Sequence, residues 1–170
     1  MNMKERSKSI YQESIISVER ISEKHEEVLL KIFKDSRTDL AWINGVTEDQ
    51  KESIIAQQFE IEQQQLKVIY PKAEMNIIRF YDKPIGRIYI HYGETADRIL
   101  EIGLLEAYRG QGIGSYIVSK VIEKASKKNK TVLLQVAWFN QGAYRFYERL
   151  GFKVIENSGV FYEMEYSSKG

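Results

Sequence analysis

The 170 residues are 43% hydrophobic and 29% charged, which suits one globular domain with a sizeable core. Lysine and arginine total 25 against 24 acidic residues, so the net charge of +1 gives no electrostatic reason to expect a nucleic-acid or membrane partner. The lack of cysteine excludes disulfides, thiolate metal sites and an acyl-cysteine intermediate. With two histidines far apart in the chain, we expect no metal site.

The first 70 residues predict a strand followed by two helices. Residues 14–20 have the branched aliphatic content of a strand, and Ser22 is a candidate N-cap for the first helix. A capping box at Thr47–Gln50 opens a second, longer helix that ends at Pro71. Its inner face is an imperfect apolar stripe: Ile54, Ile55, Phe59, Glu62 and Leu66. No apolar stretch approaches the ~18 residues of a membrane span, and the amino terminus has no apolar leader core, so we expect a cytoplasmic protein.

Residues 35–46 form a loop between these two helices and contain Trp42. Long loops with their own aromatic residues often act as lids or recognition loops. The alternative is that Trp42 only packs the loop against the core.

Three strands are predicted next. Residues 75–81 and 85–92 form a hairpin, and after a turn at 93–97 an apolar run over 99–105 is dense enough to be buried on both faces.

A glycine loop, Arg109-Gly110-Gln111-Gly112-Ile113-Gly114, follows the third of these strands and opens an amphipathic helix over 112–128. A strand, a glycine loop and a helix N-terminus form a typical phosphate site, because the free N–H groups of the first turn point at the anion. The loop lacks the Gly-Lys-Ser/Thr of a P-loop and reads GxGxG where the dinucleotide fingerprint needs GxGxxG. Spacing alone therefore leaves the phosphate unidentified, and a plain tight turn remains the alternative.

The last third predicts a buried strand over 131–136, a short helix over 141–150 with Gly151 at C′, and two strands over 152–155 and 160–166 that turn at 157–159. We expect residues 167–170 to form a frayed tail.

Two segments carry a resemblance to a known family. Arg109-x-x-Gly112-x-Gly114 after a strand resembles the [QR]-x-x-G-x-[GA] loop of the GNAT superfamily of acyl-CoA-dependent N-acyltransferases. Residues 136–152, with Asn140 and the run Tyr147-Glu-Arg-Leu-Gly-Phe152, resemble that family's strand–Asn–helix segment. The resemblance covers roughly residues 99–152. It implies an α/β fold (an α+β mixed sheet flanked by helices) in the order β-α-α-β-β-β-α-β-α-β-β, as one domain over 1–170, with the strands of Glu101 and Thr131 parallel and splayed apart.

The resemblance also implies acetyl-CoA as co-substrate, with no metal. The main chain of Ile102, Gly103 and Leu104 would hold the pantetheine arm, and the Leu104 N–H would donate to the thioester carbonyl. Asn140 and Tyr147 would contact the cofactor arm, although Asn140 could simply cap the helix that follows it. The pyrophosphate would bind the loop and the first helical turn: Arg109, Gly110, Gln111, Gly112, Ile113, Gly114 and Ser115.

Two residues are the candidate catalytic groups. By resemblance Tyr147 is the general acid that protonates the leaving thiolate, and its alternative role is that of a core aromatic. Gln135 stands where some family members carry a glutamate base, so Glu101 is the substitute, a carboxylate in an apolar strand where burial would raise its pKa. The alternatives are that Glu101 pairs with Arg98 or Arg87, or that ordered water removes the proton.

The acceptor would be a primary amine, of a small molecule in our first hypothesis. We expect its site between the 35–46 loop, the end of the second helix and the 157–159 turn, with Asp39, Glu48 and Glu156 as candidate acids. The rival functions are acetylation of a protein α-amine or lysine, a non-catalytic CoA sensor, and a nucleotide-binding module. The sequence leaves a homodimer open.

Overall fold

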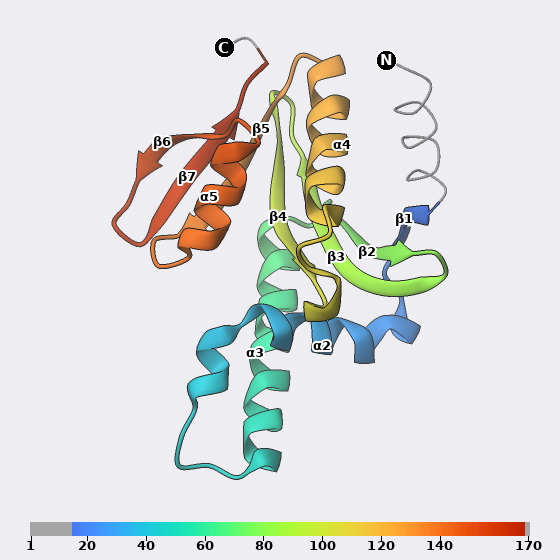
Figure 1. Ribbon diagram of the computed structural model, residues 1–170, viewed down its shortest axis with the longest axis vertical. Coiled ribbons are helices and arrows are strands. Elements are labelled where there is room, and N and C mark those ends of the chain that lie inside the picture. Colours follow the sequence, from blue (N-terminus) through green and yellow to red (C-terminus); the bar gives the residue numbers. More distant parts are fainter. Residues whose placement is uncertain (1–14, 169–170) are drawn as a thin grey trace.

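The computed structural model describes residues 15–168, which form a seven-stranded mixed sheet with helices on both faces (Figure 1). The strand order is β1-β2-β3-β4-β5-β7-β6, and β4 and β5 are the parallel pair in an otherwise antiparallel sheet. The start of the predicted first strand at Ser14 and the last two tail residues lie outside the described range. The strands are β1 Ile16–Arg20, β2 Glu74–Phe80, β3 Lys83–Tyr92, β4 Ala96–Leu104, β5 Thr131–Ala137, β6 Lys153–Asn157 and β7 Phe161–Tyr166.

The helices form two layers, one on each face of the sheet. α2 and α3 cover one face, while α4 and α5 cover the other (Figure 1). The helices are α2 Glu26–Ser36, α3 Glu48–Ile69, α4 Ile113–Lys127 and α5 Gln141–Arg149, and the short 3-10 turns are η1 Glu23–His25, η2 Thr38–Trp42 and η3 Glu106–Tyr108. The predicted order of strands and helices is confirmed. Within residues 15–168 none of these helices is both long and apolar enough to cross a membrane.

Each helix layer buries the apolar stripe that its sequence predicts. The inward side chains of α4, including Ile117 and Val121, join the core of β3, β4 and β5. On the opposite face Phe33 and Phe59 pack ring against ring at 5.4 Å above Ile77 of β2. Each fully buried aliphatic or aromatic side chain contributes roughly 1.5–3 kcal/mol, so these two stripes fix both layers on the sheet.

The imperfect stripe of α3 has a structural reason. Ile55, Phe59 and Gln63 are buried on its inner side, and the half-buried Glu62 forms an ion pair with Arg87 of β3, whose side chain is only 2% exposed. The sequence showed Glu62 as an interruption of the stripe, whereas in the fold it is the partner of a buried arginine. The N-terminal half of α3 and η2 extend away from the sheet (Figure 1).

Two expectations and one alternative need correction. β4 begins three residues before position 99, at Ala96, because Asp97 is buried within the strand and forms an ion pair with Lys130 at 3.1 Å. Its residues from Leu100 to Leu104 are only half-buried, so the expectation of burial on both faces is wrong. Trp42 is 80% exposed and does not pack its loop against the core.

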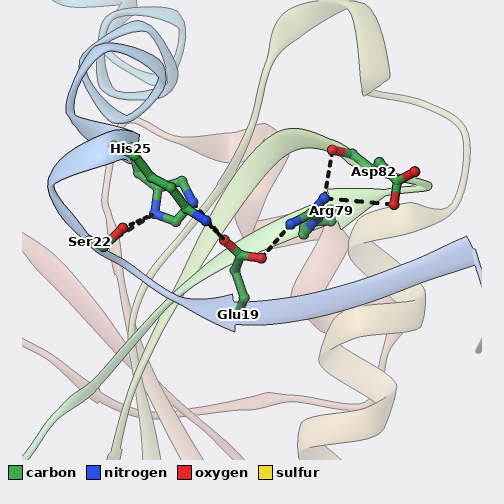
Figure 2. A network of polar contacts seen from close by, with 6 residues as sticks. Glu19, Ser22, His25, Arg79 and Asp82 are labelled. Carbon is green, nitrogen blue, oxygen red and sulfur yellow. Dashed lines mark hydrogen bonds and ion pairs between the residues drawn. The ribbon is translucent and has the colours of Figure 1, made fainter.

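A buried histidine joins β1, η1 and β2 near the start of the described chain (Figure 2). The Ser22 N–H donates to His25 Nδ1 at 3.0 Å, so the neutral ring carries its proton on Nε2 and donates it to Glu19 at 2.8 Å. The other oxygen of Glu19 binds Arg79, which also donates to the Asp82 carbonyl oxygen at 2.7 Å. The Ser22 hydroxyl also lies 3.4 Å from His25 Nδ1, but it caps the 3-10 turn by accepting from the His25 backbone N–H, so we interpret the group as structural.

We expect His25→Ala to lower the free energy of unfolding by about 2 kcal/mol, because it removes a buried ring together with its hydrogen bonds to the Ser22 N–H and to Glu19. Urea denaturation measures this loss. Lys24→Ala is the matched control: Lys24 contacts the same Glu19 at 3.4 Å but is exposed, so it should cost less than about 0.5 kcal/mol. Equal losses in the two variants would contradict the role of the histidine.

Candidate active site

The site lies where the two parallel strands separate. β4 and β5 pair over three residues each, Ala96–Arg98 with Thr131–Leu133, and then continue to Leu104 and Ala137. A β-bulge accompanies the separation, since Tyr89 lies opposite Glu101 while Ile90 lies opposite Ile99, which leaves Leu100 as the extra residue. A cleft of about 170 Å³ opens here, lined by Ile99, Leu100, Glu101, Ile102, Leu134, Gln135, Val136, Ala137, Asn140, Ala143 and Tyr147.

Glu101 brings a carboxylate with an altered pKa to this cleft. Burial raises the pKa of Glu101 to about 7 and the nearby Glu62 adds to the rise, while Arg87 and Arg37 oppose it. The Arg87 Nη2 atom lies 3.6 Å from a Glu101 oxygen, which is ion-pair distance but too long for a hydrogen bond. Arg98, the other partner considered, binds Glu163 of β7 instead. Glu101 is thus placed to exchange a proton near neutral pH.

Tyr147 brings a phenol to the same cleft. It projects from α5, is 7% exposed, and packs edge-on against Phe146 at 5.1 Å and Phe152 at 5.5 Å. Burial raises the pKa of Tyr147 well above its usual range, and the charge of Glu101 adds to the rise. The phenol therefore stays protonated at neutral pH, as a proton donor must. Its burial also fits the alternative role of a core aromatic.

The ends of α5 hold Tyr147 in place. Asn140 Oδ1 accepts a hydrogen bond from the Ala143 N–H at 3.1 Å, so Asn140 caps the helix as the alternative role required. The same residue also lines the cleft, where the rest of its amide is available to a ligand. Gly151 closes the helix at φ +102°.

The glycine loop at the start of α4 has the backbone of an anion site. Gly110 and Gly112 adopt φ of +74° and +82°, which favour glycine. A Cβ built on either would have no atom of the described residues within 4 Å, so the space beside the loop is open to a ligand. The first helical hydrogen bond runs from the Tyr116 N–H to the Gly112 oxygen at 3.0 Å, so the N–H groups of residues 113–115 precede the helical ladder. That turn contains no acidic side chain.

Two polar side chains brace this loop. Arg109 donates to the Leu104 carbonyl at 3.2 Å and to the Asp35 carbonyl at 2.8 Å, which ties the loop to β4 and α2. Gln111 donates to the Ala107 carbonyl at 3.1 Å. Both side chains donate to backbone carbonyls of the protein itself. The groups that the loop leaves for an anion are therefore main-chain N–H groups.

The predicted acceptor acids lie apart from the residues that line the cleft. Asp39 in η2 accepts two hydrogen bonds from Arg37, at 2.9 and 2.8 Å. Glu48 is the first residue of α3, and Glu156 lies exposed in β6. The polar groups that the cleft does present, besides Asn140, are Glu101, Gln135 and Tyr147.

Sequence reasoning identified Glu101 but missed the ion pair behind it. Arg87 Nη1 and Nη2 lie 2.5 and 3.3 Å from the two carboxylate oxygens of Glu62. The Arg87 guanidinium also lies over the rings of Tyr89 at 5.0 Å and Phe33 at 5.9 Å. The only signal in the sequence was the acidic residue within the apolar stripe of α3.

A mixed sheet whose parallel strands diverge over a cleft, beside an open glycine loop that begins a helix, is the α/β arrangement of an acyltransferase. Residues 29–152 match the model of the acetyltransferase (GNAT) family, and the chain belongs to this family.

The relatives agree with this assignment. The chain is 31% identical over 106 residues to the uncharacterized N-acetyltransferase CgeE of Bacillus subtilis, across 56% of this chain and 41% of the relative. It is 43% identical over 83 residues to an uncharacterized N-acetyltransferase of Methanocaldococcus jannaschii, and the match covers 44% of this chain and 36% of the relative. The chain thus spans less than half the length of these curated relatives. The crystal structure of the PaiA N-acetyltransferase of Thermoplasma acidophilum in complex with coenzyme A shares the fold, with a TM-score of 0.68 at 22% identity over 89% of this chain and 98% of that one.

Proposed function

We propose that this protein transfers the acetyl group of acetyl-CoA directly to a primary amine of a small molecule. The observation that carries the proposal is the cleft between β4 and β5, which is lined by a half-buried carboxylate with a pKa of about 7 and a buried phenol that keeps its proton at neutral pH. Membership of an acetyltransferase family supports it. Glu101 is the base and Tyr147 is the acid.

The residues present fit acetyl-CoA, which supplies the activated acetyl group as a thioester. The backbone from Gly110 to Ser115 would hold the pyrophosphate, because the open glycine loop and the first turn of α4 direct N–H groups at an anion. The exposed edge of β4 from Ile102 to Leu104, beyond its pairing with β5, would bind the pantetheine arm as an added strand does. The Leu104 N–H would polarise the thioester carbonyl.

The proton transfers of the two groups are coupled. Glu101 takes a proton from the incoming amine, and this neutralises the carboxylate whose charge helps to raise the pKa of Tyr147. Tyr147 therefore becomes a stronger acid once Glu101 has acted as base. It then donates its proton to the leaving sulfur. This order has the amine attack first and the carbon–sulfur bond break second.

Glu101 lies on the face of β3 and β4 that α2 and α3 cover, so the proposed amine would approach beside these helices. An approach bordered by helices favours a small molecule over a protein surface.

The test is a thermal-shift titration followed by thiol release. Acetyl-CoA at 100 times its Kd should add about 2.7 kcal/mol to the free energy of unfolding, and ATP or NAD should add nothing. A panel of small primary amines and one peptide with a free α-amine is then assayed for release of free thiol. A shift with NAD or ATP in place of acetyl-CoA would refute the proposal. Turnover of the peptide alone would move the acceptor to the protein class.

Gly112→Ala should weaken acetyl-CoA binding by on the order of tenfold, because an alanine at φ +82° strains or moves the N–H groups of the loop. Isothermal titration calorimetry measures the change in Kd. Gly159→Ala is the matched control, since Gly159 has φ +86° and equally open surroundings but lies in the β6–β7 turn. Both should cost roughly 1–2 kcal/mol of stability, while Gly159→Ala leaves the Kd unchanged. An equal Kd in both variants would remove the loop from the cofactor site.

A further inference from the structure

One arginine is shared by two carboxylates behind the cleft. The guanidinium of Arg87 is buried, and its one positive charge faces Glu62 of α3 and Glu101 of β4. The three ionised groups together carry a net charge of −1. Of the two acids, Glu101 alone lines the cleft. How strongly Glu101 holds a proton therefore depends on whether Arg87 interacts more strongly with Glu62 or with Glu101.

Arg87 interacts more closely with Glu62 than with Glu101. The two oxygens of Glu62 lie 2.5 and 3.3 Å from Nη1 and Nη2, the side-by-side arrangement that makes arginine–carboxylate pairs strong. Glu101 lies 3.6 Å from Nη2, beyond hydrogen-bond reach, and receives only attraction across that distance. The guanidinium also lies over the rings of Phe33 and Tyr89, at 5.9 and 5.0 Å from their centroids.

We propose that Glu62 is a positioning residue: by binding Arg87 it leaves the Glu101 carboxylate without a full counter-ion, and so keeps Glu101 ready to accept a proton. The inference rests on the proposed function, in which Glu101 is the base. It assigns a role to an α3 residue that touches neither the cleft nor its ligands.

The other charges around Glu101 are compatible with this closer pairing of Arg87 with Glu62. Arg37, at the end of α2, donates two hydrogen bonds to Asp39 and acts on Glu101 only through space. The remaining polar neighbours are uncharged at neutral pH. The groups facing Glu101 are Arg87 and Tyr89 of β3, Glu62 of α3, Arg37 after α2, Gln135 of β5 and Tyr147 of α5.

Glu62→Gln tests the proposal, because an amide of the same shape keeps one hydrogen bond to Arg87 and removes the competing charge. The Glu101 pKa should fall by about one pH unit or more, and the acidic limb of the kcat/KM profile should move down with it. Glutamate side-chain ¹³C NMR follows Glu101 directly, with its signal assigned by its loss in Glu101→Gln. Glu60→Gln is the matched control: it removes the same charge from an exposed position of α3, where Glu60 accepts only from Gln64, and should move neither readout.

The NMR titration of Glu101 tests the role of Glu62, and the kcat/KM profile tests the proposed function of Glu101 as the base. An unchanged Glu101 titration in Glu62→Gln would overturn the role of Glu62, whatever the enzyme does. A lowered Glu101 pKa supports the role of Glu62. If the pKa falls while the kcat/KM profile does not change, the assignment of Glu101 as the base is wrong. Because the NMR titration needs no substrate, it decides the inference even if no amine in the panel is acetylated.

Discussion

Tyr147→Phe should lower kcat by about 10- to 100-fold and leave the Kd for acetyl-CoA nearly unchanged. General acids contribute roughly 10²–10⁴ to a rate, and the expected loss lies at or below the lower end because a thiolate with a pKa near ~8.5 leaves without much help. The substitution removes one oxygen and keeps the ring between Phe146 and Phe152, so the packing of α5 persists. Steady-state thiol release gives kcat, and calorimetry gives Kd.

Tyr144→Phe is the control for this prediction. Tyr144 lies on the same helix but packs against Tyr162 at 5.2 Å and does not line the cleft, so its loss of a hydroxyl should not change kcat. Because burial keeps Tyr147 protonated, the parent profile should also show no alkaline limb up to about pH 9. Parent-rate turnover by Tyr147→Phe would contradict the acid role. A parent protein that binds acetyl-CoA but acetylates no amine would be the sensor instead.

The segment over 99–128 was predictable because its signals are local. The two glycines at positive φ, the break after the strand and the helical recurrence of Ile113, Ile117 and Val121 all lie within thirty residues and need no partner elsewhere. The structure confirms this order of strand, loop and helix. The contacts of Gly112 with a cofactor remain a proposal, because they depend on a ligand and not on the chain.

The surroundings of Glu101 were not predictable, because three distant segments build them. Arg87 is 25 residues from Glu62, and only the packing of α3 on β3 joins them. The sequence offered Arg98 or Arg87 as a partner for Glu101, and the choice follows from the pairing of β5 with β7, which brings Glu163 to Arg98. The bulge at Leu100, which accompanies the opening of the cleft, has no glycine or proline to mark it.

The largest loss of activity is expected for Glu101→Gln. An amide cannot accept the proton of the attacking amine, and removal of a general base costs roughly 10²–10⁴ in kcat. In the parent the base must be ionised, so kcat/KM should rise with pH up to about pH 7, where burial places the pKa of Glu101, and then level off. The variant should lose this limb. A parent profile that is flat from pH 5 to 8, or a variant that keeps the limb, would favour deprotonation through water.

The same substitution should stabilise the fold. Burial raises the folded-state pKa of Glu101 from its ordinary value of 4.5 to about 7, so ionising Glu101 costs the folded protein more than the unfolded chain. The parent therefore loses stability as the pH rises from about 4.5 to about 7, and Glu101→Gln escapes this loss. Its melting temperature should equal that of the parent at pH 4 and exceed it at pH 8. A carboxylate that lacks a full counter-ion destabilises the folded protein when it is ionised. A Glu101→Gln variant that is inactive yet less stable than the parent at pH 8 would therefore mean that Glu101 is a structural partner of Arg87.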